Sequence, residues 1–85
     1  MEDYSNFEKL LKEKYQFPCE YDFKFVVPSL QKNEILNIFS NARIREKSSK
    51  TGKYISFTVT KKVNTSEEII DSYKKTRIIK NIIML

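Results

Sequence analysis

Two segments of the chain alternate apolar and polar side chains residue by residue, and they restrict the fold more than any other feature. In the first, residues 21–27, the apolar positions hold aromatic rings or valine: Tyr21, Phe23, Phe25 and Val27. In the second, residues 54–60, apolar positions alternate with polar ones: Ile55, Phe57 and Val59 against Tyr54, Ser56, Thr58 and Thr60. A period of two is typical of a half-buried strand. We expect these two strands to form the middle of a sheet.

The segments between and around these strands have the helical period instead. Residues 5–15 place Phe7, Leu10 and Leu11 at helical spacing, and Ser5 with Glu8 has the spacing of a capping box. The helix should end before Phe17-Pro18, because a residue that precedes proline disfavours helical geometry.

Two further helices are predicted on the same grounds. After Ser29, a plausible helix cap, apolar residues recur at helical spacing: Ile35, Ile38, Phe39 and Ala42. Thr65 and Glu68 repeat the capping-box spacing, and the helix they open should turn three residues inward: Ile69, Ile70 and Tyr73.

Two outer strands complete the pattern. The segment ARIREKSS, residues 42–49, is charged enough to favour a sheet edge, where basic side chains discourage unwanted pairing. Gly52 supplies the positive φ that a tight hairpin turn needs before the next strand. The segment IIKNIIML, residues 78–85, is apolar in both registers and predicts a strand that needs cover on both faces.

The predicted order is one helix followed by β-α-β-β-α-β. Right-handed crossovers lead this order to a ferredoxin-like α+β sandwich, a four-stranded antiparallel sheet with two helices on one face. We expect a single domain over residues 1–85, with an extra N-terminal amphipathic helix at 1–16 and the ferredoxin-like core at 17–85.

The composition of the chain excludes some classes of function but does not identify one. Sixteen basic against eleven acidic residues give a net charge of +5, which favours acidic partners. The chain has no histidine, the commonest catalytic base at neutral pH and the commonest metal ligand, and its one cysteine, Cys19, cannot form a disulfide within the chain. No apolar run is long enough to span a bilayer. We expect a cytoplasmic, non-catalytic protein without a metal or other cofactor and without membrane association.

The chain also resembles a known family. The stretches FPCEYDFKFVVP and SSKTGKYISFTVT, followed by a short helix and an apolar C-terminal segment, look like the YbeD-like family of small bacterial proteins of unknown function, the domain of unknown function 493. The resemblance covers about residues 16–85, and its most specific part is Ser49-x-x-Gly52-x-Tyr54-x-Ser56. It implies the same sandwich, similar to ACT-type regulatory domains. Those domains carry a glycine in the turn after the first strand, and residues 27–31 contain none.

The turn and its flanking strands form the candidate binding surface. It combines basic side chains, hydroxyl groups and one phenol: Arg43, Arg45, Lys47, Ser49, Lys50, Lys53, Tyr54 and Ser56. Guanidinium groups and hydroxyls together suit phosphate or carboxylate groups. The same pattern is also typical of a solvated edge strand with a ladder of β-forming hydroxyl residues. A P-loop is excluded, because its first glycine is missing and a strand follows in place of a helix.

Three hypotheses about partners follow. The first is a regulatory or protein-interaction module that binds an unknown protein or a small acidic ligand. The alternative is RNA binding through the same basic sheet face, although only Tyr54 would offer a ring for stacking. Finally, the apolar C-terminal strand needs cover from either the N-terminal helix or a second subunit, which predicts a homodimer through that edge as one of two options.

Overall fold

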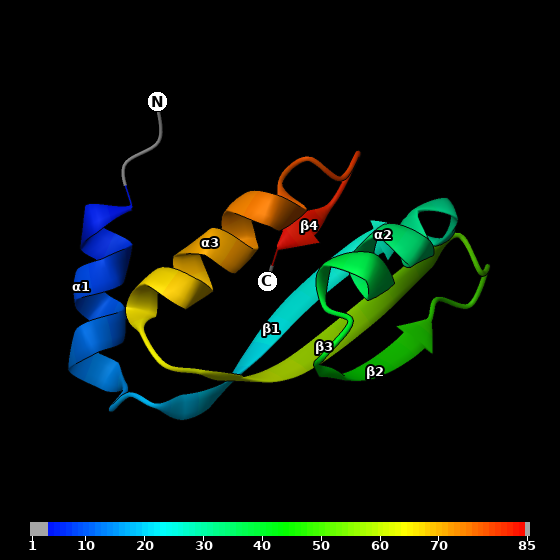
Figure 1. Ribbon diagram of the computed structural model, residues 1–85. Helices are drawn as coiled ribbons and strands as arrows, with labels where there is room; N and C mark the ends of the chain where they lie inside the picture. The colour runs from blue at the N-terminus through cyan, green and yellow to red at the C-terminus, as the bar shows by residue number, and fades with distance from the viewer. Residues whose placement is uncertain (1–3, 85) are drawn as a thin grey trace.

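The structure, a computed structural model, describes residues 4–84. Figure 1 shows its elements in chain order: α1 (Ser5–Lys14), β1 (Cys19–Pro28), the 3₁₀ turn η1 (Ser29–Gln31), α2 (Lys32–Ile38), β2 (Arg43–Ser48), β3 (Tyr54–Val63), α3 (Ser66–Thr76) and β4 (Ile83–Met84).

The four strands form one antiparallel sheet in the order β2-β3-β1-β4. The central strands β1 and β3 pair along their whole length, from Cys19 opposite Val63 to Pro28 opposite Tyr54. The arginine-bearing strand β2 lies at one edge and β4 at the other. The predicted α+β fold, its four-stranded antiparallel sheet and its central pair of strands are therefore confirmed.

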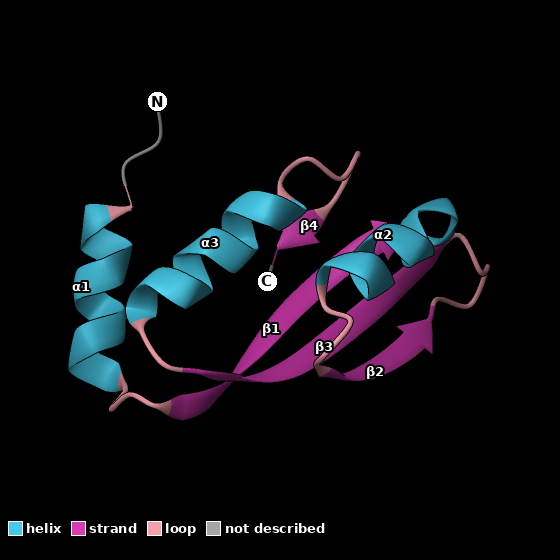
Figure 2. Ribbon diagram, in the orientation of Figure 1, coloured by secondary structure: helices cyan, strands magenta, loops and turns pink. Residues whose placement is uncertain are grey.

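One face of the sheet carries the core. Helices α2 and α3 both lie over this face, which Figure 2 shows in two layers. The alternation in β1 and β3 turns the expected residues toward these helices, and the largest of them are fully buried: Phe23, Phe25, Phe57, Val27 and Val59. Ile35 of α2 and Ile69 of α3 meet them from the helical layer. The opposite face of the sheet, which we call the open face, has no helix over it in Figure 1.

Helix α1 packs beside α3 at one end of the molecule. The ring of Phe7 meets the ring of Tyr73 edge-on, with 5.7 Å between centroids. The carboxylate of Glu8 accepts a hydrogen bond of 3.3 Å from the hydroxyl of Ser66. The predicted Ser5–Glu8 capping box is wrong, because Tyr4 holds the N-cap position and Glu8 reaches α3 instead. Helix α1 therefore packs against the helical layer and does not cover the open face.

The second predicted capping box is confirmed. At the start of α3, the amide of Glu68 donates to the hydroxyl of Thr65 at 3.3 Å, and the carboxylate of Glu68 accepts from the amide of Thr65 at 3.2 Å. The same carboxylate also accepts from the amide of Asn64. These reciprocal bonds satisfy amide groups that the first helical turn leaves without partners.

Ser29 has a different role from the predicted helix cap. It opens the 3₁₀ turn η1, and α2 begins only at Lys32. The amide of Ser29 donates to the carbonyl of Lys53 at 2.9 Å, and its hydroxyl donates to the carbonyl of Gly52. Through these two hydrogen bonds, Ser29 links the end of β1 to the turn between β2 and β3.

The predicted C-terminal strand over residues 78–85 is wrong in length. Only Ile83–Met84 is a strand, opposite Val26 and Phe25, and Leu85 lies outside the described residues. The chain after α3 is a turn that includes Asn81 at φ +61°, a conformation that asparagine tolerates well. Ile79 points into the core from this turn, whereas Ile78 is 85% exposed. A strand of two residues does not need a second subunit to cover it, and the homodimer stays a prediction.

Candidate binding surface on the open sheet face

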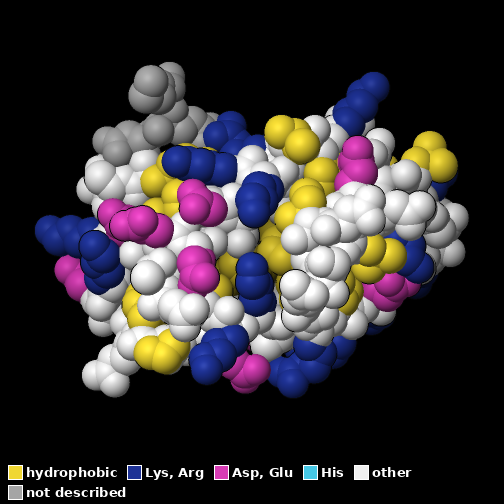
Figure 3. Space-filling view, viewed as in Figure 1, with side chains coloured by type: hydrophobic (Ala, Val, Ile, Leu, Met, Phe, Trp, Pro, Cys, Tyr) yellow, Lys and Arg dark blue, Asp and Glu magenta, His cyan; other side chains and the backbone are white. Residues whose placement is uncertain are grey.

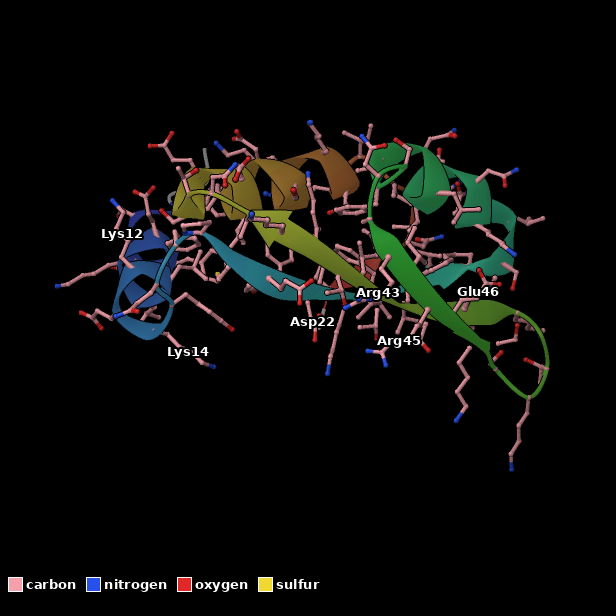
Figure 4. The ribbon with its side chains drawn as sticks, turned by 60° about the horizontal axis from the view of Figure 1, so that its bottom comes forward. Lys12, Lys14, Asp22, Arg43, Arg45 and Glu46 are labelled. Atoms are coloured by element: carbon pink, nitrogen blue, oxygen red, sulfur yellow. The ribbon has the colours of Figure 1, made fainter. Side chains whose placement is uncertain are left out.

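The open face is organised in rows that run across the strands. Residues opposite each other in an antiparallel pair share a face, so the strand registers place the exposed side chains in order. The first row is Arg43, Thr60 and Asp22; the second is Arg45, Thr58 and Lys24; the third is Lys47, Ser56, Val26 and Ile83. Figure 4 shows Arg43 and Arg45 on β2 with Asp22 on β1, while Lys12 and Lys14 lie on α1 at the end of the molecule.

Opposite charges balance each other in the first row. The hydroxyl of Thr60 donates a hydrogen bond of 2.6 Å to the carboxylate of Asp22. The guanidinium of Arg43 lies 3.8 Å from the carboxylate of Glu20, which precedes Asp22 by two residues on the same face. A depression of about 490 Å³ covers this end of the face, lined by Tyr15, Glu20, Asp22, Arg43, Arg45 and Thr60.

The second row carries two cations without partners. Within residues 4–84, neither Arg45 nor Lys24 makes an ion pair or a side-chain hydrogen bond. The hydroxyl of Thr58 lies between them in the register. Adjacent strands lie about 4.8 Å apart, so the row offers two cations and a hydroxyl across roughly 10 Å. This is the arrangement on the open face that is best suited to an anionic group.

The third row changes from polar to apolar along its length. The hydroxyl of Ser56 donates to the carbonyl of Lys47 at 3.3 Å. A second depression of about 200 Å³ is lined by Val26, Lys47, Ser48, Ser49, Tyr54 and Ser56. Beyond Val26, the row ends at Ile83 on β4.

The turn at residues 49–53 is a hairpin corner, as the sequence predicts. Gly52 has φ +74°, and the amide of Gly52 donates to the carbonyl of Ser49 at 3.0 Å. The hydroxyl of Ser49 accepts from the amide of Tyr54 at 3.2 Å, so Ser49 holds the turn closed. Lys50 and Lys53 are exposed at the tip, and neither lines the two depressions described above.

The eight predicted surface residues are thus distributed over three places. Arg43 and Arg45 line the larger depression, whereas Lys47, Ser49, Tyr54 and Ser56 line the smaller one. Lys50 and Lys53 lie at the tip of the turn. The sequence places Lys24 and Asp22 on the polar side of their strand but does not assign them to the binding surface, because only the register of β1 against β3 aligns them with the arginines of β2.

The opposite side of the molecule carries charges of both signs. Figure 3 shows acidic and basic side chains interspersed over helices α1 and α3. A depression of about 330 Å³ between these helices is lined by Tyr4, Ser5, Glu8, Glu67, Ile70, Asp71 and Lys74. The helical side is therefore mixed in charge, whereas basic residues outnumber acidic ones on the open face.

A cluster of tyrosines lies between the sheet and the helices. The hydroxyls of Tyr21 and Tyr73 lie 3.1 Å apart, and both rings pack against Phe23. Burial raises the pKa of Tyr73 well above its ordinary value, and the bond to Tyr21 adds to the effect. The two hydroxyls form a hydrogen bond with each other between the sheet and the helices, so their role is structural.

Other kinds of site receive no support from the described residues. Among residues 4–84, no three His, Cys, Asp or Glu side chains come together in a group that could hold a metal ion. Cys19 is half-buried at the start of β1. Over the same residues, every helix is too short or too polar to cross a bilayer.

The fold and the surface define a small α+β protein with a helical layer on one side and an exposed, mostly basic sheet on the other. The chain belongs to the family described as Protein of unknown function (DUF493), whose model matches residues 12–85. The predicted membership is therefore confirmed, from the last turn of α1 through the whole sheet. No curated protein and no solved structure matches the chain.

Proposed function

We propose that the protein is a cytoplasmic, non-catalytic interaction module whose open face binds an acidic partner. The observation that carries the proposal is the second row of the open face, where Arg45 and Lys24 flank Thr58 and have no partner within residues 4–84. Cations that the fold leaves unpaired are available to an anion from outside, and an arginine fork binds carboxylate or phosphate with two parallel hydrogen bonds.

The overall balance of the open face supports the same partner. Its ionic side chains on the three long strands are five basic residues, Lys24, Arg43, Arg45, Lys47 and Lys62, and two acidic ones, Glu20 and Asp22. Both carboxylates already have partners, in Arg43 and Thr60. The excess of positive charge favours a negative partner and speeds its approach.

The connectivity supports a regulatory class of fold. The order β1-α2-β2-β3-α3-β4 with strand order β2-β3-β1-β4 supports a ferredoxin-like sandwich with an extra N-terminal helix, similar to ACT-type domains. Such sandwiches leave one sheet face free for a ligand or a partner. Because a fold does not determine a function, the proposed function depends on the side chains of the open face.

The burial of Thr60, the best candidate for a nucleophile on the open face, also favours binding over catalysis. Covalent catalysis needs a nucleophile that a base activates and that substrate can reach. The hydroxyl of Thr60 does donate to a carboxylate, but Thr60 is only 9% exposed. The bond therefore links β3 to β1, and a substrate has little access to the hydroxyl of Thr60.

The alternative partner is a single-stranded nucleic acid, which Tyr54 favours because it lies exposed beside Lys47 and Lys53. One stacked base contributes about 1–3 kcal/mol, which is modest for a whole binding site. We regard nucleic acid as the second candidate, behind an acidic protein or ligand.

Binding measured against salt concentration tests the proposal. A polyglutamate peptide and single-stranded RNA and DNA oligonucleotides are titrated separately. We expect at least one of the three to bind at low salt, and for a nucleic acid with three phosphate contacts we expect a log-log slope of about −2.

Matched variants locate the binding. Arg45→Gln and Lys24→Gln should each weaken it several-fold, whereas Lys12→Gln on α1 removes the same charge at a distance and should change it little. The proposal fails if none of these anions binds at low salt, or if all three variants weaken binding equally.

A further inference from the structure

On the open face, an apolar area adjoins the unpaired cations. We infer that the partner is a protein segment that carries a large apolar side chain next to its carboxylates. The inference rests on the proposed function, because it names the kind of partner for the same surface.

The apolar area consists of Val26, Tyr54 and Ile83. Tyr54 is 46% exposed and Ile83 is 52% exposed, while Val26 is half-buried and lies opposite Ile83 in the register. Val26 and Tyr54 line the depression of about 200 Å³, and Lys47 stands at its rim. These side chains keep part of their contact with water in the folded protein, so a partner that covers them gains the favourable free energy of burying the remaining apolar surface.

The apolar area and the cations lie one side-chain repeat apart. Val26 follows Lys24 by two residues on β1, so the two side chains are about 7 Å apart on the same face. A partner can match this spacing with an acidic and an apolar residue at positions i and i+2 of an extended segment, or at i and i+4 of a helix. Both spacings are common in protein sequences, so an ordinary peptide segment can present the two side chains.

Charge argues against a second copy of this chain as the occupant. Two open faces brought together would oppose an excess of basic residues with the same excess, because basic residues outnumber acidic ones five to two on the three long strands of each face. Like charges across an interface destabilise it. An acidic segment instead pairs with the cations that the fold leaves free.

The aliphatic residues argue against nucleic acid at the same place. Val26 and Ile83 offer no ring on which a base could stack, and they lie beside the row of cations that would hold the phosphates. A peptide side chain such as leucine covers them well. The surface therefore fits a carboxylate and an apolar side chain together better than a phosphate backbone.

Two synthetic dodecapeptides test the inference by titration at low salt. The first is all glutamate, and the second is the same peptide with two interior glutamates replaced by leucine. The second has less charge, so electrostatics alone would weaken its binding. We expect it to bind about tenfold more tightly, since burial of a leucine side chain outweighs the lost charge.

Two isoleucine variants provide the matched comparison. Ile83→Thr should remove the gain from leucine and leave binding of the all-glutamate peptide unchanged. Ile78→Thr makes the same change at an isoleucine that is exposed in the turn after α3, and it should retain both affinities. Circular dichroism of both variants checks that they fold.

The outcomes separate this inference from the function on which it rests. The inference is overturned if leucine gives no gain, if Ile83→Thr leaves the gain intact, or if a single-stranded oligonucleotide of twelve nucleotides binds more tightly than both peptides. In these cases binding that depends on Lys24 and Arg45 would still support the proposed function. If no peptide or oligonucleotide binds the wild-type protein, both fail.

Discussion

Thr60 donates a hydrogen bond of 2.6 Å to the carboxylate of Asp22, directly across the two central strands. This bond gives the carboxylate of Asp22 a donor within the sheet at the acidic end of the open face. The next row along the same strands, with Lys24 and Arg45, has no such bond within residues 4–84. The two carboxylates at one end of the face therefore have partners, and the cations of the adjacent row are available for binding.

Replacement of Thr60 by valine tests the structural role of this bond. Thr60→Val keeps the shape of the side chain but removes the donor to a charged acceptor, and it should lower the free energy of unfolding by about 2 kcal/mol. Thr58→Val is the control, since it makes the same change on the same strand and face at a hydroxyl without a side-chain partner within the described residues. Urea denaturation measures both. Equal effects of the two substitutions would contradict the assigned role of Thr60.

The buried hydroxyl of Tyr73 predicts how stability changes in alkaline solution. Because the pKa of Tyr73 is raised in the folded state, the unfolded chain loses this proton first as the pH rises above about 10. The unfolded state then binds fewer protons than the folded state, so the free energy of unfolding falls with pH above about 10, and this contribution is constant below it.

Substitution of Tyr73 by phenylalanine isolates this effect. Tyr73→Phe loses the bond to Tyr21, at a cost of about 1 kcal/mol near neutral pH, but its stability should fall less steeply above pH of about 10. Tyr54→Phe, on the open face, should follow the wild type. Urea denaturation over a series of pH values gives the slopes, and an unchanged alkaline slope in Tyr73→Phe would exclude this tyrosine as the cause.

The capping box of α3 gives a local test of the fold. Thr65→Ala removes the acceptor for the amide of Glu68 and should cost about 1 kcal/mol, whereas Thr65→Ser retains the oxygen and should cost much less. Thermal unfolding measures the difference. A loss of the same size in both variants would mean that the methyl group of Thr65, and not its hydroxyl, supports the helix.

The sequence predicts the centre of this fold well. The alternation at Phe23, Phe25 and Phe57 places these rings on one face of the sheet, and only that face can be the buried one. Their burial against two helices follows from the period of two, and Gly52 at positive φ follows from the hairpin between the strands. The C-terminal segment is different. Its isoleucines are apolar in every register, so periodicity cannot distinguish a strand from a turn that sends Ile79 into the core.

The binding surface is predictable only in part, for a related reason. The sequence shows that Arg45 belongs to a charged edge strand and that Lys24 lies on the polar side of a central strand. It does not show that they share a row, because that depends on two strand registers that are set by packing across the whole sheet. Likewise, the sequence does not show that Ser29 fastens the turn at Gly52, since this contact joins residues distant in the chain.

The central claim is that Arg45 and Lys24 form the anion-binding row of the open face, and amide chemical-shift mapping by NMR tests it most directly. On titration with polyglutamate at low salt, we expect the largest shifts at Lys24, Arg45 and Thr58, with smaller shifts at Lys47 and Ser56. The amides of α1 and α3 should remain nearly unchanged. Shifts concentrated on those helices, or an absence of shifts on β1, β2 and β3, would contradict the account.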